Sequence, residues 1–461
     1  MKKISKFAVF FLSVLFILSA CQTSESEIVP EYDSDTDLND LDGYTVKWAW
    51  MFQDTVLGYV EGSNFADMAI ERKKQVEKDL NCNIELIYNA KAADLYNAAL
   101  SSGQHYCDIL TGGNTLRAYA RNGYFMGLSS LLDLENTYKW GSPLSLTSMA
   151  WIDDVYAVIP NSWPELFLAS AGYPIVVNGN LVSKYGLEDP REFVENNEWN
   201  WDKYEECLHN YTVQDGENTV YGHLTHSPYF GIAMFLSNGV SFAEYVDGAV
   251  VSGFYTDKGR TALERAKKIK SETCADCFHP EDNAYFQTGI DLFTNNVAVL
   301  FTTRGDDLLS GTNSIIYKLD NIGIIPFPSG PDAKPGVYSG YNQGLYYSTS
   351  ITVNSTDVEA SATILSEMYE PFEGYETKEQ VIDYMANQIF FDEQDARIYY
   401  NILENTEYGY YYEGGRDLID KIFVSSDPVS SILESYEDQY TALIEDYMTP
   451  IYKGIVSVYG E

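Results

Sequence analysis

Two cysteines and a histidine in the sequence CADCFH, residues 274–279, have the spacing most suggestive of chemistry. A zinc site needs a second pair of ligands besides this one. Phe278 stands between Cys277 and His279, so the motif is not the one that attaches haem. We therefore expect a local disulfide or two free thiols at Cys274 and Cys277, and no metal or other cofactor.

Other short catalytic motifs are weak or missing. The sequence HLTH, residues 223–226, spaces two histidines three apart with no acid nearby, which favours polar packing or a surface position over metal binding. No two glycines stand two apart, and the sequence lacks a Walker A loop, an HExxH motif and a GxSxG elbow. The 68 acidic residues could contain a glycosidase pair, because sequence spacing does not reveal the distance between two carboxylates. No motif points to an enzyme, however, and we expect none.

The charge of the chain restricts its partners. The net charge is −39, whereas binding to a phosphate backbone needs clustered Lys and Arg. We therefore expect no nucleic-acid partner. The hydrophobic content of 45% and aromatic content of 15% indicate a well-packed globular protein.

The N-terminus differs from the rest of the chain. Residues 1–20 combine a lysine-rich start with a short apolar run, which is typical of a signal peptide and too short for a membrane span. The sequence LSAC, residues 18–21, resembles the bacterial lipobox, so Cys21 is expected to carry a lipid; an ordinary cleaved signal is the alternative. Residues 21–43 are acidic and read as a flexible tether. We expect a protein anchored to the outer face of the bacterial cell membrane.

Strand and helix patterns alternate after the tether. Strands are predicted at 44–51, 82–89 and 106–113, with helices at 64–80 and 92–103 between them. This order predicts a parallel α/β sheet, in which ligands bind beyond the carboxyl ends of strands. Trp50 and the turn from Gly112 to Asn114 fall at such ends. Further along, strands are predicted at 155–160, 172–178, 297–306 and 321–331, and a helix at 256–270.

The ordered set of segments resembles bacterial extracellular solute-binding proteins of ABC importers, especially the group that binds carbohydrates. FADMAIERKKQVEKDLNCNIEL (residues 65–86) looks like the family's first strand–helix–strand unit. VVNGNLVSKYGLEDP (176–190), EWNWDKYEECLHNYTVQDGENTVYG (198–222) and DLFTNNVAVLFTTRGD (291–306) are similar to later family segments. The resemblance spans nearly the whole chain after the signal peptide.

This resemblance implies two α/β lobes, joined by a hinge of crossing strands, that close on a ligand. Lobe 1 is expected at 44–158 and 344–395, and lobe 2 at 159–343 and 396–461. Crossings are expected at 158–163 and 338–343, with a third in the segment 368–417. The implied function is capture of a carbohydrate, expected to be an oligosaccharide, by a monomer that delivers it to an ABC permease. A surface glycoside hydrolase or lyase, and a glycan adhesin or sensor without a transporter, are the alternatives.

Sugar binding needs aromatic faces for the apolar ring faces and planar polar groups for the hydroxyls. Residues of these types at strand ends and crossings are the candidates, each with side-chain packing as its alternative. They are Trp50, Asn114, Trp163, Glu165, Tyr229, Phe230, Arg304, Asp306, Tyr338, Tyr341 and Asn342.

Two further features are interpreted as structural. Asp108 precedes the last apolar residues of its strand and is expected to accept hydrogen bonds within the fold. In EWNWDKY, residues 198–204, Asn200 can cap a helix that begins at Trp201, with Trp199 packing just before the cap. We therefore expect both tryptophans to pack in the fold, although their pairing suggests a sugar platform.

Overall fold

The structure is a computed structural model, and this account concerns its unit Asp40–Glu461. The residues that it describes are 40–51, 55–56, 59–60, 64–112, 116–152, 154–160, 168, 170–246, 249–281, 286–309, 314–342, 348–408, 415–450 and 453. The predicted signal peptide and Cys21 lie outside them. None of the helices in the described residues is long and apolar enough to cross a bilayer.

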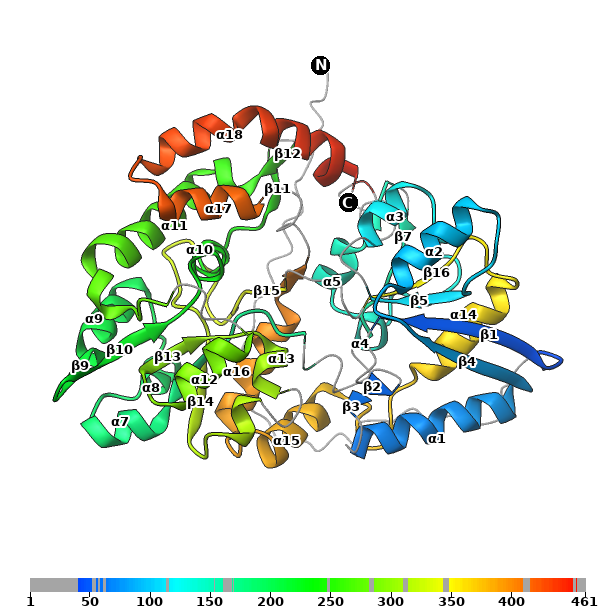
Figure 1. Ribbon diagram of the computed structural model, residues 1–461, viewed down its shortest axis with the longest axis horizontal. Helices are drawn as coiled ribbons and strands as arrows, with labels where there is room; N and C mark the ends of the chain where they lie inside the picture. The colour runs from blue at the N-terminus through cyan, green and yellow to red at the C-terminus, as the bar shows by residue number, and fades with distance from the viewer. Residues whose placement is uncertain are drawn as a thin grey trace, which may run out of the picture. The chain divides into compact units, whose positions relative to one another are not determined.

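The first sheet has four strands in the order β16 (Thr349–Ile351), β5 (Ile109–Thr111), β1 (Tyr44–Trp50) and β4 (Cys82–Tyr88). β1 pairs in parallel with both β4 and β5, as the alternating pattern predicted, while β16 pairs antiparallel with β5. α1 (Asn64–Asp79) follows β1 and packs against β4 and α14 (Val358–Met368), as Figure 1 shows. α2 (Ala92–Ser101) connects β4 to β5.

The second sheet has five strands in the order β14 (Ile322–Ile325), β8 (Ile175–Asn178), β13 (Ala298–Thr302), β10 (Asn218–Leu224) and β9 (Val213–Asp215). β10 and β13 are parallel, and β8 runs antiparallel to both β13 and β14. Every residue of β8 and β13 is buried, which explains their continuous apolar sequences. The first sheet thus has one antiparallel strand, β16, and the second has two, β8 and β9.

Short strands accompany the chain where it passes between the sheets. β15 (Gly340–Asn342) lies in sequence between β14 of the second sheet and β16 of the first, and pairs in parallel with β17 (Thr406–Tyr408). The predicted crossing at 158–163 is described only up to residue 160, and there Val158 forms a single bridge with Thr349. The predicted strand at 155–160 is therefore wrong in its extent, because only β7 (Asp154–Val155) and this bridge form.

Helices surround the second sheet. They are α7 (Gly179–Tyr185), α8 (Pro190–Glu195), α9 (Trp201–Tyr211), α10 (Ser227–Leu236), α11 (Asp257–Lys268), α12 (Phe286–Thr294) and α13 (Gly305–Leu309), followed later by α15 (Lys378–Gln388), α16 (Glu393–Glu404), α17 (Gly415–Val424) and α18 (Val429–Leu443). α17 packs against α10, and α18 against α11 (Figure 1).

The remaining elements are short. They are β2 (Thr55–Val56), β3 (Tyr59–Val60), α3 (Leu116–Arg121), α4 (Thr137–Trp140), α5 (Pro143–Ser148), β6 (Ala150–Trp151), β11 (Ala243–Val246) and β12 (Ala249–Ser252), with 3-10 or π-helical turns at Gly253–Tyr255, Ile269–Thr273, Ala275–Cys277, Ile315–Tyr317 and Ile444–Met448.

α15 contacts a helix beside the first sheet, and α16 contacts a strand of the second sheet. Tyr384 of α15 makes an edge contact with Phe65 of α1, the ring centroids standing 5.1 Å apart. Asp395 of α16 accepts a hydrogen bond from the backbone N–H of Ile324 in β14, at 2.9 Å. The boundary predicted between residues 395 and 396 falls inside α16, and the lobe boundaries stay a prediction.

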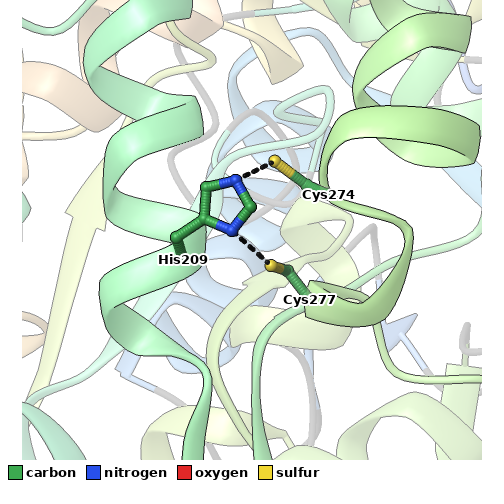
Figure 2. Close-up of side chains that lie close together, drawn as sticks. All are labelled: His209, Cys274 and Cys277. Carbon is green, nitrogen blue, oxygen red and sulfur yellow. Dashed lines mark hydrogen bonds between the residues drawn. The ribbon is translucent and has the colours of Figure 1, made fainter.

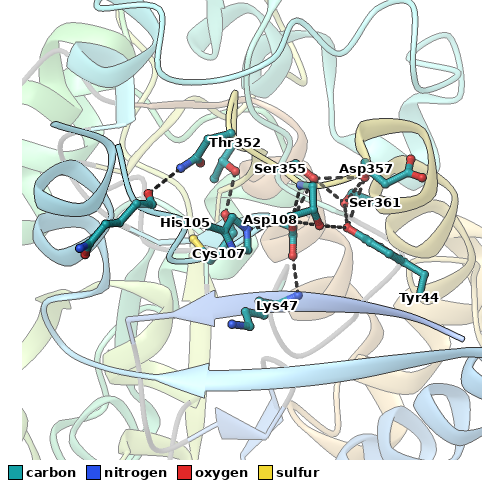
Figure 3. Close-up of polar contacts among 12 residues, drawn as sticks. Tyr44, Lys47, His105, Cys107, Asp108, Thr352, Ser355, Asp357 and Ser361 are labelled. Carbon is teal, nitrogen blue, oxygen red and sulfur yellow. Dashed lines mark hydrogen bonds and ion pairs between the residues drawn. The ribbon is translucent and has the colours of Figure 1, made fainter. Parts of the chain in front are cut away.

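Asp108 is a buried acceptor within the first sheet's surroundings, as expected (Figure 3). Its carboxylate accepts hydrogen bonds from the backbone N–H groups of Lys47 and Thr356, both at 2.8 Å, and contacts His105 Nε2 at 3.0 Å. Burial raises the pKa of Asp108, but these donors outweigh burial and hold the pKa below its ordinary value of 3.8. The residue ties the middle of β1 to the segment after β16.

The prediction for EWNWDKY is confirmed. Asn200 caps α9, its side-chain oxygen accepting from the backbone N–H groups of Asp202 and Lys203. Trp199 and Trp201 are both buried, and Trp199 Nε1 donates to the carbonyl oxygen of Pro326 at 2.9 Å. The paired tryptophans therefore hold the start of α9 in place.

Candidate functional site

Three strands of the second sheet end at the same edge. Thr302, the last residue of β13, and Ile325, the last residue of β14, both pair with Ile175, the first residue of β8. Leu224, the last residue of β10, pairs with Phe301 of β13. The residues that follow β10 and β13 and precede β8 are thereby collected at one edge, where parallel α/β sheets place their ligands.

A group of tyrosines occupies this edge. Tyr229, in the first turn of α10 after β10, stacks on Tyr173, which precedes β8, with ring centroids 4.4 Å apart and an angle of 23° between the planes. Tyr341 of β15 contacts Tyr173 at 5.9 Å, and His226 lies edge-on to Tyr229 at 4.7 Å. Chain segments far apart in sequence thus combine into one largely buried aromatic cluster.

The backbone at Tyr173 is strained. Its φ is 53°, in the left-handed region that aromatic residues seldom adopt, and the next residue is Pro174. Such strain costs on the order of 1–3 kcal/mol and concentrates at ligand-binding and active sites. Here it sets the ring of Tyr173 against Tyr229.

Arg304 lies beside the tyrosines, just after β13. Its guanidinium Nη2 contacts Asp306 Oδ2 and Asp307 Oδ1, each at 2.9 Å. The two aspartates raise the pKa of Arg304 against the opposing effect of burial, and Tyr229 is close enough to contribute. Burial raises the pKa of Asp306 to about 6, with Arg304 acting in the opposite direction. Asp306 retains 32% side-chain exposure, against 9% for Asp307, so it is the carboxylate that a solute can reach.

The crossing strand β15 completes this edge. Asn342 Nδ2 donates to the carbonyl oxygen of Ser170 at 2.8 Å. Gly172 lies directly on the backbone of Tyr341, since a Cβ at Gly172 would stand 2.1 Å from the Tyr341 carbonyl carbon. The absence of a side chain at Gly172 therefore permits β15 to lie against the segment that precedes β8.

At the first sheet, Trp50 is the last residue of β1. Its side chain is 1% exposed and its ring lies 5.3 Å from that of Trp48. Trp48 Nε1 donates to Thr111 Oγ1 at 2.8 Å, whereas Trp50 Nε1 has no hydrogen-bond partner among the described residues. Buried indole N–H groups normally have a partner, so Trp50 offers a donor for a bound molecule or a water.

The other predicted residues lie elsewhere. Phe230 is fully buried and contacts the rings of Tyr204, Phe278, Phe327 and Phe423, so the structure places it in the hydrophobic core.

Tyr338 is separate from the tyrosine stack. It lines a cavity of about 550 Å³ together with residues of α8 and α16, and an adjoining one of about 200 Å³ that Trp199 also lines. Asn114, Trp163 and Glu165 lie outside the described residues.

Of the predicted residues, Tyr229, Arg304, Asp306, Tyr341 and Asn342 thus lie near the ends of the second-sheet strands, while Trp50 ends a strand of the first sheet. Their role in ligand binding stays a prediction. Sequence reasoning missed Tyr173 and Asp307. The tripeptide Gly172–Tyr173–Pro174 at the start of a predicted strand was the available signal for Tyr173.

Aromatic faces beside a guanidinium–carboxylate group suit a polar solute with apolar faces and hydroxyl groups. Asp306 provides an acceptor that solvent reaches, and beside it Tyr173, Tyr229 and Tyr341 form an aromatic cluster that is only 1–4% exposed in this arrangement. Of the two histidines of HLTH, His223 is structural: it is buried and contacts Tyr204 Oη and Thr302 Oγ1, and burial holds its pKa well below 6.5. His226 lies against Tyr229 instead.

Several solved structures share the fold of this chain. The GacH receptor of Streptomyces glaucescens, solved unliganded and with acarbose, is 13% identical, with 88% of this chain and 99% of that chain covered and a TM-score of 0.57. An ABC substrate-binding protein of Listeria monocytogenes in complex with cycloalternan is 14% identical, with 88% and 100% covered and a TM-score of 0.56. A Rhizobium etli sugar transporter in an open conformation is 15% identical, with 87% and 100% covered and a TM-score of 0.60.

At these identities the solved structures establish the fold, the two-lobed arrangement of periplasmic binding proteins that the sequence predicted. A comparison with curated proteins finds no match. The family model of the bacterial extracellular solute-binding proteins matches residues 58–363, more than half of the chain. On this evidence the chain belongs to the family of bacterial extracellular solute-binding proteins.

Proposed function

We propose that this protein captures a carbohydrate, specifically an oligosaccharide, between its two lobes and delivers it to the membrane permease of an ABC importer. The observation that carries the proposal is the stack of Tyr173 on Tyr229 beside the Arg304–Asp306 pair. A stacked aromatic surface covers the apolar face of a pyranose ring, and a carboxylate held by a guanidinium accepts hydroxyl hydrogen bonds.

The ligands of proteins with the same fold support this choice of solute. Acarbose is bound by the GacH receptor, cycloalternan by the Listeria protein, and maltotriose by a MalE domain of Bdellovibrio bacteriovorus that also has this fold. Each of these ligands is an oligosaccharide or an analogue of one. Ribitol in a protein of Agrobacterium radiobacter is a smaller polyol, so ligand size is the feature that the screen must cover.

A thermal-shift screen over monosaccharides, linear and cyclic oligosaccharides, polyols and peptides tests the proposal. A ligand that binds the native state alone raises the melting temperature, by an amount that grows with its concentration. We expect shifts with oligosaccharides. Shifts with peptides and none with any sugar would overturn the carbohydrate assignment.

Tyr229→Ala tests the site itself. Removing the stacked ring exposes one face of Tyr173 and deprives a sugar of its aromatic partner, which is worth about 0.5–1.5 kcal/mol, or roughly threefold to tenfold in Kd. Tyr211→Ala is the matched control, because Tyr211 is buried like Tyr229 but lies on α9, outside the site. Isothermal titration of both variants with the best ligand separates the site from a general effect of losing a tyrosine.

The alternative function, a surface glycoside hydrolase, can be tested directly by looking for cleaved sugar. Incubating the purified protein with the oligosaccharides that shift its melting temperature, followed by chromatography, detects any released product. We expect the sugars to be recovered intact, because a binding protein must release its solute unchanged to the permease. Turnover that is lost in Asp306→Asn would instead assign an enzyme.

We also propose that Cys21 carries a lipid that anchors the protein to the outer face of the cell membrane. The support is the sequence LSAC after an apolar run, followed by an acidic tether. Cys21→Ser should release the protein from the membrane fraction, while Cys82→Ser leaves it there. A membrane-bound Cys21→Ser protein would contradict the anchor.

A further inference from the structure

Three side chains from two distant segments meet at the end of α9. His209 lies in the last turn of α9, Cys274 follows the π-helical turn Ile269–Thr273, and Cys277 ends the turn Ala275–Cys277. Figure 2 shows the imidazole of His209 between the two sulfur atoms, one ring nitrogen facing each. The cysteines belong to the CADCFH motif, and the histidine stands 65 residues before Cys274.

The distances match those between ligands of one metal ion. His209 Nε2 stands 3.5 Å from Cys274 Sγ, and His209 Nδ1 stands 3.5 Å from Cys277 Sγ. One ligand atom from each residue can be chosen so that all lie within 4.8 Å of one another. Zinc bonds of about 2.3 Å to sulfur and 2.0–2.1 Å to nitrogen, at tetrahedral angles, separate ligand atoms by roughly 3.5–3.8 Å. Only a turn of the imidazole, which presents one nitrogen to both sulfurs, and a small contraction are needed.

The framework that holds the sulfurs is fixed. Cys274 and Cys277 are 0% and 1% exposed, and their backbone N–H groups donate to the carbonyl oxygens of Ile269 and Cys274. The chain directly after them is attached to β10, since His279 N donates to the His223 carbonyl oxygen at 2.9 Å. His209 is exposed, so its ring can turn and solvent can supply a further ligand. Such a buried, preorganised sulfur pair behind one exposed imidazole suits metal capture.

The donor set selects the class of ion. Thiolate sulfur and imidazole nitrogen favour thiophilic ions such as Zn²⁺, whereas Ca²⁺ and Mg²⁺ require oxygen ligands. We propose that His209, Cys274 and Cys277 bind one thiophilic d¹⁰ metal ion, for which Zn²⁺ is the probe, with solvent completing the coordination. Ion binding would link the last turn of α9 to the segment 274–279, which is hydrogen-bonded to β10 through His279. The site is independent of carbohydrate binding, so either assignment can fail without the other.

Metal titration of the full chain tests this site. The protein is reduced with a phosphine, freed of metal by a chelator and titrated anaerobically with Zn²⁺ against a chromophoric competitor. We expect one Zn²⁺ per chain and a melting temperature that rises with zinc concentration. Co²⁺ in the same site should give the near-ultraviolet thiolate-to-metal charge-transfer band together with the visible bands of tetrahedral cobalt. This spectrum needs no variant and reports sulfur ligation directly.

Variants identify the ligands. Cys274→Ser and Cys277→Ser should each weaken Zn²⁺ binding by more than the roughly 10–100-fold loss typical of an altered outer-shell residue, with the charge-transfer band reduced. His209→Ala should weaken binding while the band persists. Cys207→Ser is the matched control, because Cys207 is a buried cysteine on the same helix outside the trio, and its zinc affinity should be unchanged. Circular dichroism of each variant verifies folding.

Three results would overturn the site. The first is a reduced chain that binds no Zn²⁺. The second is Zn²⁺ binding that survives in the double variant C274S/C277S. The third is Co²⁺ binding without a charge-transfer band. Either of the last two results would assign the metal to surface carboxylates. A Cys274–Cys277 disulfide that reforms under reducing conditions, seen by mass spectrometry, belongs with the first result, because it removes both thiolates.

Discussion

The indole of Trp50 provides the sharpest test of the site at the scale of single residues. Its Nε1 is buried with no partner among the described residues. Folding has therefore already removed water from this donor, and a bound sugar hydroxyl can accept its hydrogen bond without a further desolvation cost for the N–H group. Trp50→Phe keeps an aromatic ring and removes that donor together with part of the indole's volume. We expect Kd to rise by roughly threefold to tenfold, equivalent to about 0.5–1.5 kcal/mol.

Trp201→Phe is the control for that measurement. Trp201 Nε1 also lacks a partner among the described residues, but Trp201 packs at the start of α9 and not at a sheet edge. Titration calorimetry should give this variant the affinity of the unaltered protein. Equal losses in the two variants would show that the Trp50 N–H does not meet the ligand.

Asp108 yields a prediction about stability and pH. Asp108→Asn keeps the shape but turns an NH₂ group toward backbone donors, which leaves buried groups unpaired at a cost of about 1–3 kcal/mol. The folded-state pKa of Asp108 is below its ordinary 3.8, so its ionised form contributes stability above that pH, and this contribution is lost as the pH falls through the folded-state value.

Urea denaturation at neutral pH and in acid measures this effect. The gap in unfolding free energy between Asp108→Asn and the unaltered protein should be largest at neutral pH and should shrink in acid. Asp133→Asn, which changes an exposed carboxylate, should show no gap at either pH. A gap that widened in acid would contradict the assigned direction of the pKa shift.

At the scale of elements, the contact of Gly172 with β15 predicts a severe effect of one methyl group. A Cβ at Gly172 would stand 2.1 Å from backbone atoms of Tyr341, which have no side-chain freedom to relieve the clash. We expect Gly172→Ala to lower the unfolding free energy by about 3 kcal/mol, at the upper end of overpacking effects, and to weaken solute binding.

Gly374→Ala separates steric from conformational cost. Gly374 has a φ of 85°, but nothing lies within 4 Å of a Cβ built there. Its alanine variant should lose only about 1 kcal/mol through the backbone. Thermal unfolding that gave both variants the same loss of stability would contradict this prediction. It would show that the packing of Gly172 against β15 adds no steric cost to the substitution.

Elements with local signals were predictable from the sequence. The run from β1 to β5 follows its predicted order and direction, because apolar spacing in Val46, Trp48 and Trp50 of β1 and the periodicity of α1 are visible within a few residues. The cap at Asn200 was predictable for the same reason.

Contacts between distant segments were not predictable. β16 pairs with β5, a partner some 238 residues earlier, as in the contact of Thr111 with Thr349. The stack of Tyr173 on Tyr229 and the meeting of His209 with Cys274 likewise depend on how helices and strands pack, which single-chain spacing does not encode. Phe230 was chosen for its position near a strand end, but its side chain points into the core, and residue type alone does not distinguish these orientations.

At the scale of the whole molecule, the chain passes from the first sheet to the second after β5 and returns through β15 to β16, and α15 and α16 then lead it to β17, the partner of β15. Few strands carry these connections, which permits rotation of one lobe against the other. A solute that contacts both lobes favours the closed arrangement by its difference in affinity for the two states. Solute binding should therefore change the dimensions of the molecule.

Small-angle X-ray scattering measures that change. A compact chain of this length has a radius of gyration of roughly 22 Å, and we expect a saturable decrease on addition of the carbohydrate that gives the largest thermal shift. The midpoint of the decrease should coincide with the calorimetric Kd, because closure and binding are one linked equilibrium. Tyr229→Ala should reach the same compact state at a higher ligand concentration, since it weakens binding without altering the hinge.

Calorimetric binding with an unchanged radius of gyration would mean that the solute occupies one lobe only. The Trp50 and Tyr229 variants would then identify which lobe it is.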